Sequence, residues 1–123
     1  MWVITEDIEA VCWANQDYRR VLTTTDTYQL VAMTIPPGVE VGEETHHDAA
    51  QFVRIVAGVA EVTVGDEHAE LHVRGAFLVP PGTRHNVRSV GTMPLRLLAF
   101  YAPPLHPADT VHPTRPDDEV API

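Results

Sequence analysis

Apolar and polar residues alternate along short segments in the middle of the chain, and turn residues separate these segments. Segments rich in β-branched and aromatic residues lie at 28–35, 51–57, 60–64, 69–73, 76–79, 85–90 and 95–102. Glycine and proline mark the intervals, as in Pro36-Pro37-Gly38 and Pro80-Pro81-Gly82. Many short strands at close spacing predict an all-β sandwich or barrel. A short helical turn is also predicted near Thr5–Trp13.

The segment QFVRIVAG shows the alternation most clearly. Gln51, Val53 and Ile55 share one face of the predicted strand, and Phe52, Arg54 and Val56 share the other. A tight two-residue turn at Ala57-Gly58 would return the chain as a hairpin. This pairing places Arg54 opposite Glu61, so we expect a cross-strand ion pair there rather than a substrate contact.

The parity of the last strand predicts which side chains line the interior. If Arg96 faces outward, then Leu95, Leu97, Ala99 and Tyr101 face inward. On this basis Gln29, Met33 and Tyr101 are the predicted substrate-contacting residues. No arginine cluster falls on an inferred inward face, where it could hold a phosphate.

The chain divides into three parts of one predicted domain. Residues 1–27 form an N-terminal segment with the first strand, residues 28–102 form the barrel, and residues 103–123 form a proline-rich arm. The arm holds six of the eleven prolines, so it cannot supply an interior strand. It is either a disordered tail or an extended arm over the barrel or a neighbouring subunit. Outward apolar residues such as Phe52 and Val56 need cover, which predicts a homodimer.

Composition narrows the function classes. The 123 residues are 45% apolar, which suits one folded domain, and the net charge is −9. The acidic balance argues against nucleic acid or an anionic membrane as a partner. All eight basic residues are arginine, which excludes lysine Schiff-base chemistry. The acidic start, the absence of a long apolar run and the single cysteine, Cys12, predict a cytoplasmic protein without an internal disulfide.

Four residues have the chemistry of a metal site. Glu44 and His46 lie two apart, so on an extended segment they point to the same side. Gln51 begins the next strand, and His85 follows a Pro-Gly turn. Imidazole and carboxylate are ordinary ligands for a divalent Zn, Fe, Mn or Ni ion. Two histidines with one carboxylate are also the ligand types of non-haem iron oxygenases.

The spacing of these residues resembles the cupin superfamily. The first cupin motif has the form G-x5-H-x-H-x3,4-E-x6-G, and the stretch from Gly38 to Gly58 has the same spacing, with Glu44 at the first histidine and Gln51 at the glutamate. The second motif, G-x5-P-x-G-x2-H-x3-N, is matched from Gly75 to Ser89. It is one residue short before the proline and has serine at its last position.

The stretches IPPGVEVGEETHHDAAQFVRIVAG, PPGTRHNV and YAPPLHPADTVHPT are similar to small single-domain cupins labelled mannose-6-phosphate-isomerase-like. The resemblance implies an antiparallel double-stranded β-helix, or jelly-roll barrel, with a metal inside its mouth. The ligands it implies are Glu44, His46, Gln51 and His85. That label does not establish isomerase activity.

The remaining histidines are expected at the surface. His47 lies on the opposite face from His46, and His68 and His72 lie on an edge-like strand. His106 and His112 belong to the arm, where the alternative to exposure is that they fold over the barrel mouth and act as acid or base. Cys12 and Trp13 are expected to pack at the edge of the barrel.

Two classes of function remain open at this stage. One is a mononuclear metal-dependent enzyme that acts on a polar small molecule by isomerase, lyase or cyclase chemistry, or as a non-haem iron dioxygenase. The other is a non-catalytic module that binds a sugar or another small molecule.

Overall fold

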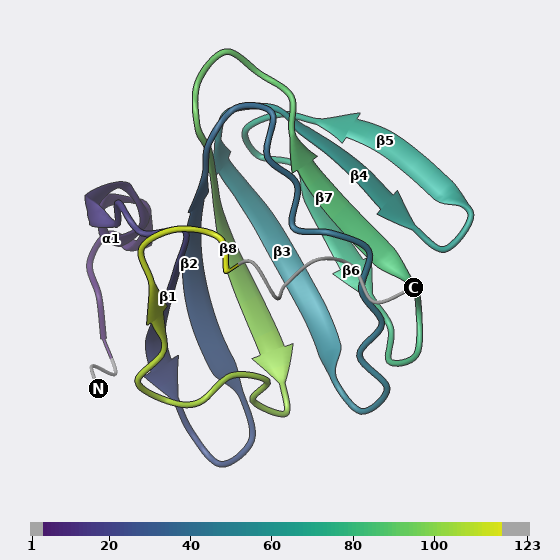
Figure 1. The fold of residues 1–123 in the computed structure, drawn as a ribbon. Helices are drawn as coiled ribbons and strands as arrows, with labels where there is room; N and C mark the ends of the chain where they lie inside the picture. Colours follow the sequence, from purple (N-terminus) through teal and green to yellow (C-terminus); the bar gives the residue numbers. More distant parts are fainter. Residues whose placement is uncertain (1–3, 117–123) are drawn as a thin grey trace.

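The computed structural model describes residues 4–116, and its regular secondary structure is almost entirely antiparallel strands (Figure 1). The helix α1 spans Ile8–Ala14. The strands are β1 (Arg19–Thr24), β2 (Gln29–Ile35), β3 (Ala50–Ala57), β4 (Ala60–Val64), β5 (Glu67–Leu71), β6 (Ala76–Val79), β7 (His85–Ser89), β8 (Leu95–Ala102) and β9 (Val111–His112). Within residues 4–116, no helix is long and apolar enough to span a bilayer.

The strands form two sheets that enclose the core. The larger sheet has the order β6-β3-β8-β2-β1-β9, and the smaller has the order β5-β4-β7. Residues 39–44 extend the smaller sheet along β7, because Val41 N donates to Val87 O (2.9 Å) and Ser89 N donates to Val39 O (2.9 Å). The two sheets form the kind of sandwich or barrel that the alternation predicts, and the added pairing brings the GEETHH segment against β7.

The predicted parity of the barrel strands is confirmed. Leu95, Leu97, Ala99 and Tyr101 all belong to the buried core, together with Val53 and Ile55 of β3. The strand register aligns inward-facing residues of neighbouring strands. Gln51 of β3 lies opposite Tyr101 of β8, and Tyr101 lies opposite Gln29 of β2. A single row at one end of the barrel therefore presents three polar side chains inward.

Helix α1 covers part of the outer face of the larger sheet. Asp7 caps its first turn by accepting a hydrogen bond from Ala10 N. Cys12 is fully buried in a second cluster with Ala32, Val56 and Leu98. The expectation that Val56 needs cover from a neighbouring subunit is therefore wrong, because the chain's own helix packs on it.

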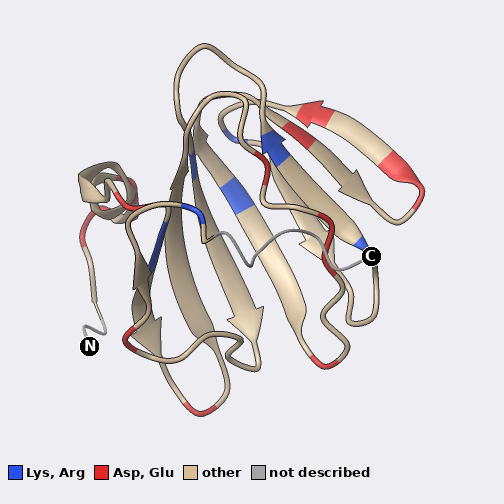
Figure 2. Cartoon of the chain, in the orientation of Figure 1, with Lys and Arg blue, Asp and Glu red and all other residues tan. Residues whose placement is uncertain are grey.

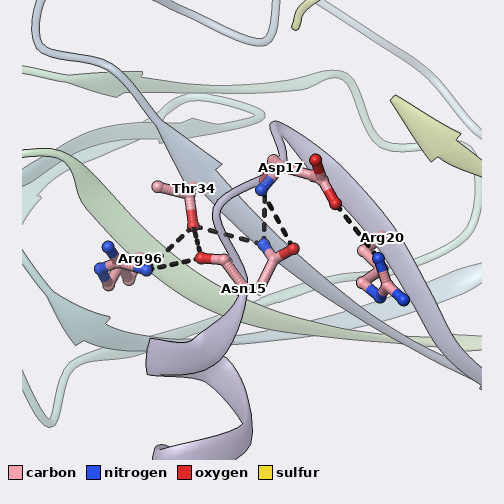
Figure 3. A network of polar contacts seen from close by, with 5 residues as sticks. All are labelled: Asn15, Asp17, Arg20, Thr34 and Arg96. Atoms are coloured by element: carbon pink, nitrogen blue, oxygen red, sulfur yellow. Dashed lines mark hydrogen bonds and ion pairs between the residues drawn. The ribbon is translucent and has the colours of Figure 1, made fainter. Parts of the chain in front are cut away.

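The outward-facing Arg96 lies in a polar network beneath this helix (Figure 3). Its Nη1 donates to Asn15 O at 2.7 Å, and Thr34 Oγ1 donates to the same carbonyl at 2.9 Å. The guanidinium carbon also lies 4.7 Å from the centre of the Trp13 ring. Arg96 is only 8% exposed, so its direction was predicted correctly, but it fastens the helix to the sheet rather than meeting solvent.

The predicted hairpin at Ala57-Gly58 is wrong. The chain leaves the larger sheet after β3 and enters the smaller sheet at β4, so these strands are not paired. Arg54 instead bonds Glu9 of α1 at 2.7 Å, and Glu61 lies opposite Glu70 and Arg88. Gly58 has φ +86°, and a Cβ there would lie 2.8 Å from both Leu95 Cα and Pro94 O, so this crossing requires glycine.

The described part of the proline-rich arm is an ordered strap rather than a disordered tail. Its strand β9 pairs with β1 at the edge of the larger sheet, with His112 opposite Arg19. Arg115 then donates to Val41 O at 2.9 Å. The strap thus crosses from one sheet to the segment beside the other, and the rest of the predicted arm, residues 117–123, lies outside the described residues.

Candidate metal centre

The main chain brings Glu44 and His85 together. Each backbone N–H donates to the other residue's carbonyl at 2.9 Å, so residues distant in sequence become direct neighbours. The segment that carries His46 is bonded to the turn before His85, because Gly82 N–H donates to His46 O at 2.8 Å. Gly82 has φ +79°, as a turn after two prolines requires. The Pro-Pro-Gly sequence therefore fixes the position of both histidine-bearing segments.

Three ligand-type side chains converge at this point. One atom each of Glu44, His46 and His85 lies within 4.8 Å of the other two. His46 Nε2 is 3.8 Å from Glu44 Oε1, and the two imidazole centres are 5.0 Å apart. Ligand atoms bound at about 2.0–2.2 Å from one ion are themselves about 3–4.5 Å apart, so the distance between His46 Nε2 and Glu44 Oε1 suits two ligands of one ion, and His85 lies close to that arrangement.

His85 is oriented as metal-bound histidines usually are. Its Nδ1 lies 3.0 Å from Thr83 O and so carries the proton, which leaves the lone pair on Nε2. That Nε2 is buried and has no hydrogen-bond partner among the described residues. An unsatisfied buried acceptor is costly, and an ion at this position would satisfy it.

Gln51 also has a buried hydrogen-bond acceptor. Its Nε2 donates to Tyr101 Oη at 3.3 Å, which fixes the orientation of the amide. Its Oε1 is buried and has no partner within residues 4–116. Gln51 lines the cavity that Glu44 and His85 also line.

The surroundings keep both imidazoles neutral. Burial lowers the pKa of His46 from 6.5 to about 4, and the neighbouring His85 and the charge of Arg19 act in the same direction. Burial also lowers the pKa of His85, although its bond to Thr83 O opposes the shift. A neutral imidazole is the form that binds a metal.

The cavity beside these residues is small and mostly closed. Its volume is about 20 Å³, enough for little more than one water molecule. Met33 and Tyr101 line it, as predicted for substrate-contacting residues, and substrate contact itself stays a prediction. Gln29 is fully buried, and its amide bonds the arm: Nε2 donates to His106 O at 2.7 Å, and Oε1 accepts from Leu105 N and His106 N.

The two histidines of the arm were expected to be exposed, but both are partly buried. His106 is half-buried, and its ring lies edge-on to Tyr101 at 5.6 Å. His112 Nδ1 lies 3.0 Å from Arg19 Nη1. The alternative interpretation, that the arm folds over the mouth, describes the structure better. His47, His68 and His72 are exposed, as predicted.

Sequence reasoning missed Arg19, which lines the cavity although it is only 2% exposed. A signal was present in the pair Arg19-Arg20. On a strand, neighbouring residues face opposite sides, so one arginine of the pair had to point inward.

The comparisons with known proteins agree with this architecture. A family model for the cupin domain matches residues 31–101. The chain is 38% identical over 109 residues to the uncharacterized protein YrkC of Bacillus subtilis, covering 84% of this chain and 59% of YrkC. The crystal structure of BH2720 from Bacillus halodurans superimposes with a TM-score of 0.88 and 38% identity, covering 91% of this chain and 89% of that one.

A partial likeness extends to a larger enzyme. The chain is 32% identical over 73 residues to mannose-1-phosphate guanylyltransferase of Escherichia coli, which is 59% of this chain but 15% of that protein. The chain thus spans about three-fifths of YrkC and a much smaller part of the guanylyltransferase. The family match covers more than half of the chain, and the strand order and the paired motifs agree with it. The chain belongs to the cupin superfamily, as a small cupin with the double-stranded β-helix fold.

Proposed function

We propose that this cupin binds one divalent metal ion through Glu44, His46, Gln51 and His85. The observation that carries the proposal is the pair of buried acceptors, His85 Nε2 and Gln51 Oε1, that have no partner among the described residues. They line the same cavity as Glu44, and His46 lies within a ligand's distance of Glu44. One ion would satisfy all four groups.

The donor set favours a transition metal. Two neutral imidazoles, one carboxylate and one amide oxygen suit Zn, Fe, Mn or Ni, whereas Mg and Ca prefer oxygen ligands alone. One carboxylate against a divalent ion leaves a net charge of about +1 at the centre. One carboxylate and two imidazoles, as in Glu44, His46 and His85, are also the ligand types of non-haem iron sites. An iron enzyme that uses dioxygen is therefore the second candidate function.

We infer that the protein is a metal-dependent enzyme for a polar small molecule, of isomerase, lyase or cyclase type. When bound, the ion would supply Lewis acidity. The chain's own residues prepare the site: Tyr101 fixes the amide of Gln51, and Thr83 fixes the tautomer of His85. The strap lies next to it, with the ring of His106 edge-on to Tyr101. A non-catalytic module that binds a sugar or another small molecule through the same ion is the alternative, and activity screening separates the two.

The experiment is metal analysis of protein purified without added metal. We expect about one equivalent of a transition metal in the wild type and in the control variant His47→Ala, whose side chain is exposed. His46→Ala and His85→Ala should lose most of the metal while keeping the β-rich circular dichroism spectrum. Wild-type occupancy in either variant would remove that residue from the site. Activity screening then uses the metal that was found.

A further inference from the structure

A groove opens the side of the barrel between the two sheets. Strand β5 ends the smaller sheet and β6 ends the larger one, and no strand within residues 4–116 pairs with the outer edge of either. The groove, which residues of β4, β5 and β6 line, has a volume of about 340 Å³. This size lies within the range of small-molecule sites.

The groove is lined mainly by apolar side chains at the open edge of the core. Val64, Leu71 and Phe77 line it, are only partly buried and pack against the core cluster. Ala69 lies opposite the buried Val62, on the inner face of the smaller sheet, yet is itself exposed. Apolar surface that faces the interior of the barrel is therefore left open to a ligand on this side.

The charge around the groove disfavours an anion. The β4–β5 hairpin carries the acidic residues Glu61, Glu67 and Glu70 (Figure 2), and Glu67 itself lines the groove. A negative group in the groove would be repelled by these carboxylates. The groove therefore suits an uncharged apolar group.

Phe77 stands between this groove and the candidate metal centre. It is the one described residue that lines both the groove and the small cavity beside Glu44 and His85. The strand register agrees: Phe77 lies opposite Val53, which lines the small cavity, and Val64 of the groove lies opposite His85. The two spaces are therefore neighbours, and the Phe77 side chain is part of the wall of each.

The cavity at the centre has no room for a substrate as it stands. Its volume is about 20 Å³, and the strap lies on another side of it, where the ring of His106 meets Tyr101. A substrate must therefore gain space from a side chain that moves. Phe77 belongs to a strand that is paired on one side only, and rotation of a partly buried ring needs no backbone change.

We propose that the groove holds the apolar body of the substrate and that Phe77 is the gate between the groove and the metal centre. The inference rests on the proposed function and names its substrate class: a small molecule with one polar, metal-ligating end and an uncharged aryl or short alkyl body. Rotation of the Phe77 ring would join the two spaces and give the polar end the room that the small cavity lacks. Burial of the apolar body against Val64, Ala69 and Leu71 would supply affinity.

The test compares two hydroxamates with the same metal-ligating group, acetohydroxamate with a methyl body and benzohydroxamate with a phenyl body. Calorimetric titration of the metal-loaded wild type should give an affinity about ten- to a hundredfold higher for benzohydroxamate, because the ring is buried in the groove. Ala69→Phe fills the groove and should remove this preference with unchanged metal content. Thr63→Phe carries the same ring on the exposed face of β4 and should keep it. Equal affinities in the wild type, or an unchanged preference in Ala69→Phe, would overturn the proposal.

A kinetic readout tests the gate separately. Association of benzohydroxamate, followed by stopped-flow absorbance, should be about tenfold faster in Phe77→Ala, because no ring has to leave its preferred rotamer. Gln29→Leu, which loosens the strap, tests a route through the mouth instead. Acceleration in Gln29→Leu with none in Phe77→Ala would overturn the gate. If Phe77→Ala does not fold, Phe77→Leu decides, because its association must also be faster than that of the wild type.

The outcome is also distinct from failure of the metal site. If the wild type binds no metal, the metal-free protein is titrated with the neutral dye Nile red. Dye fluorescence that Ala69→Phe abolishes and Thr63→Phe retains would support the groove as a site for an apolar group without the ion. Equal dye binding by the two variants, or none by the wild type, would overturn it.

Discussion

At the scale of single residues, the amide of Gln51 has its orientation fixed by Tyr101. The hydroxyl of Tyr101 accepts from Gln51 Nε2, and Gln51 lines the cavity with its Oε1 buried. A carboxylate at this position would keep the contact, because Tyr101 can donate as well as accept. Either donor could therefore occupy this position, and the choice between them would set the charge at a bound ion.

Gln51→Glu should tighten metal binding and slow catalysis. The substitution conserves size and adds a negative charge beside the ion, and desolvation cancels much of the Coulomb gain. We expect a net gain of roughly 1–3 kcal/mol, about ten- to a hundredfold in affinity. The added charge also makes the ion a weaker Lewis acid. Titration of metal into the apo protein measures the affinity, with the exposed Gln16→Glu as control. An unchanged dissociation constant would mean that Gln51 is not a ligand.

The metal-free protein should lose stability on acidification through His46. The pKa of this group is about 4 when folded and 6.5 ordinarily, so the unfolded state binds the proton more readily between these values. The free energy of unfolding should therefore decrease as pH falls from about 6.5 to 4. Denaturant titrations at several pH values should show a shallower decrease for His46→Gln than for the wild type or His47→Gln. Parallel curves for all three proteins would contradict this assignment.

The residues of the centre could be anticipated from sequence because their spacing is local. Glu44, His46 and Gln51 lie within one short segment, and a Pro-Gly turn marks His85. Arg19 and His106 could not be placed in this way. The Arg19-Arg20 pair indicates that one arginine points inward but not which one, and the position of His106 depends on bonds that the buried Gln29 makes to the strap.

At the scale of elements, strand existence was easier to predict than strand pairing. Alternation marked β2, β3 and β8 to within a residue at either end, because burial on one face leaves a period-two pattern. The same pattern does not indicate which strands pair with each other. Gly58 looked like a hairpin turn, yet it marks a crossing between sheets, a choice decided by the close approach of Leu95 and Pro94.

Gln29→Leu should release the strap. The substitution removes the acceptor for Leu105 N and His106 N and the donor to His106 O, and it leaves these backbone groups unsatisfied. Local opening should become about ten- to a hundredfold more frequent. Hydrogen–deuterium exchange of amides in residues 104–112 measures it, with the exposed Gln16→Leu as control. Exchange as slow as in the wild type would show that other contacts hold the strap.

At the scale of the whole molecule, the larger sheet leaves an apolar row on its outer face beyond the reach of α1. Phe52 lies opposite Leu78 on one side and Phe100 on the other, and the rings of Phe100 and Tyr28 stack at 5.3 Å. These side chains are between 38% and 68% exposed. An apolar row of this kind across adjacent strands is typical of an interface.

We therefore propose that two copies associate through this row, and that Phe52→Glu separates them. Phe52 lies at the centre of the row, where a charge would be buried between two apolar surfaces. The loss should exceed about 2 kcal/mol, so the dimer dissociation constant should rise at least about thirtyfold. Light scattering after size exclusion at tens of micromolar should give a dimer for the wild type and for Met93→Glu, because Met93 is also apolar and exposed but lies outside the row. Phe52→Glu should be monomeric with unchanged metal content, because the centre lies inside the barrel. A monomeric wild type would contradict the proposal outright.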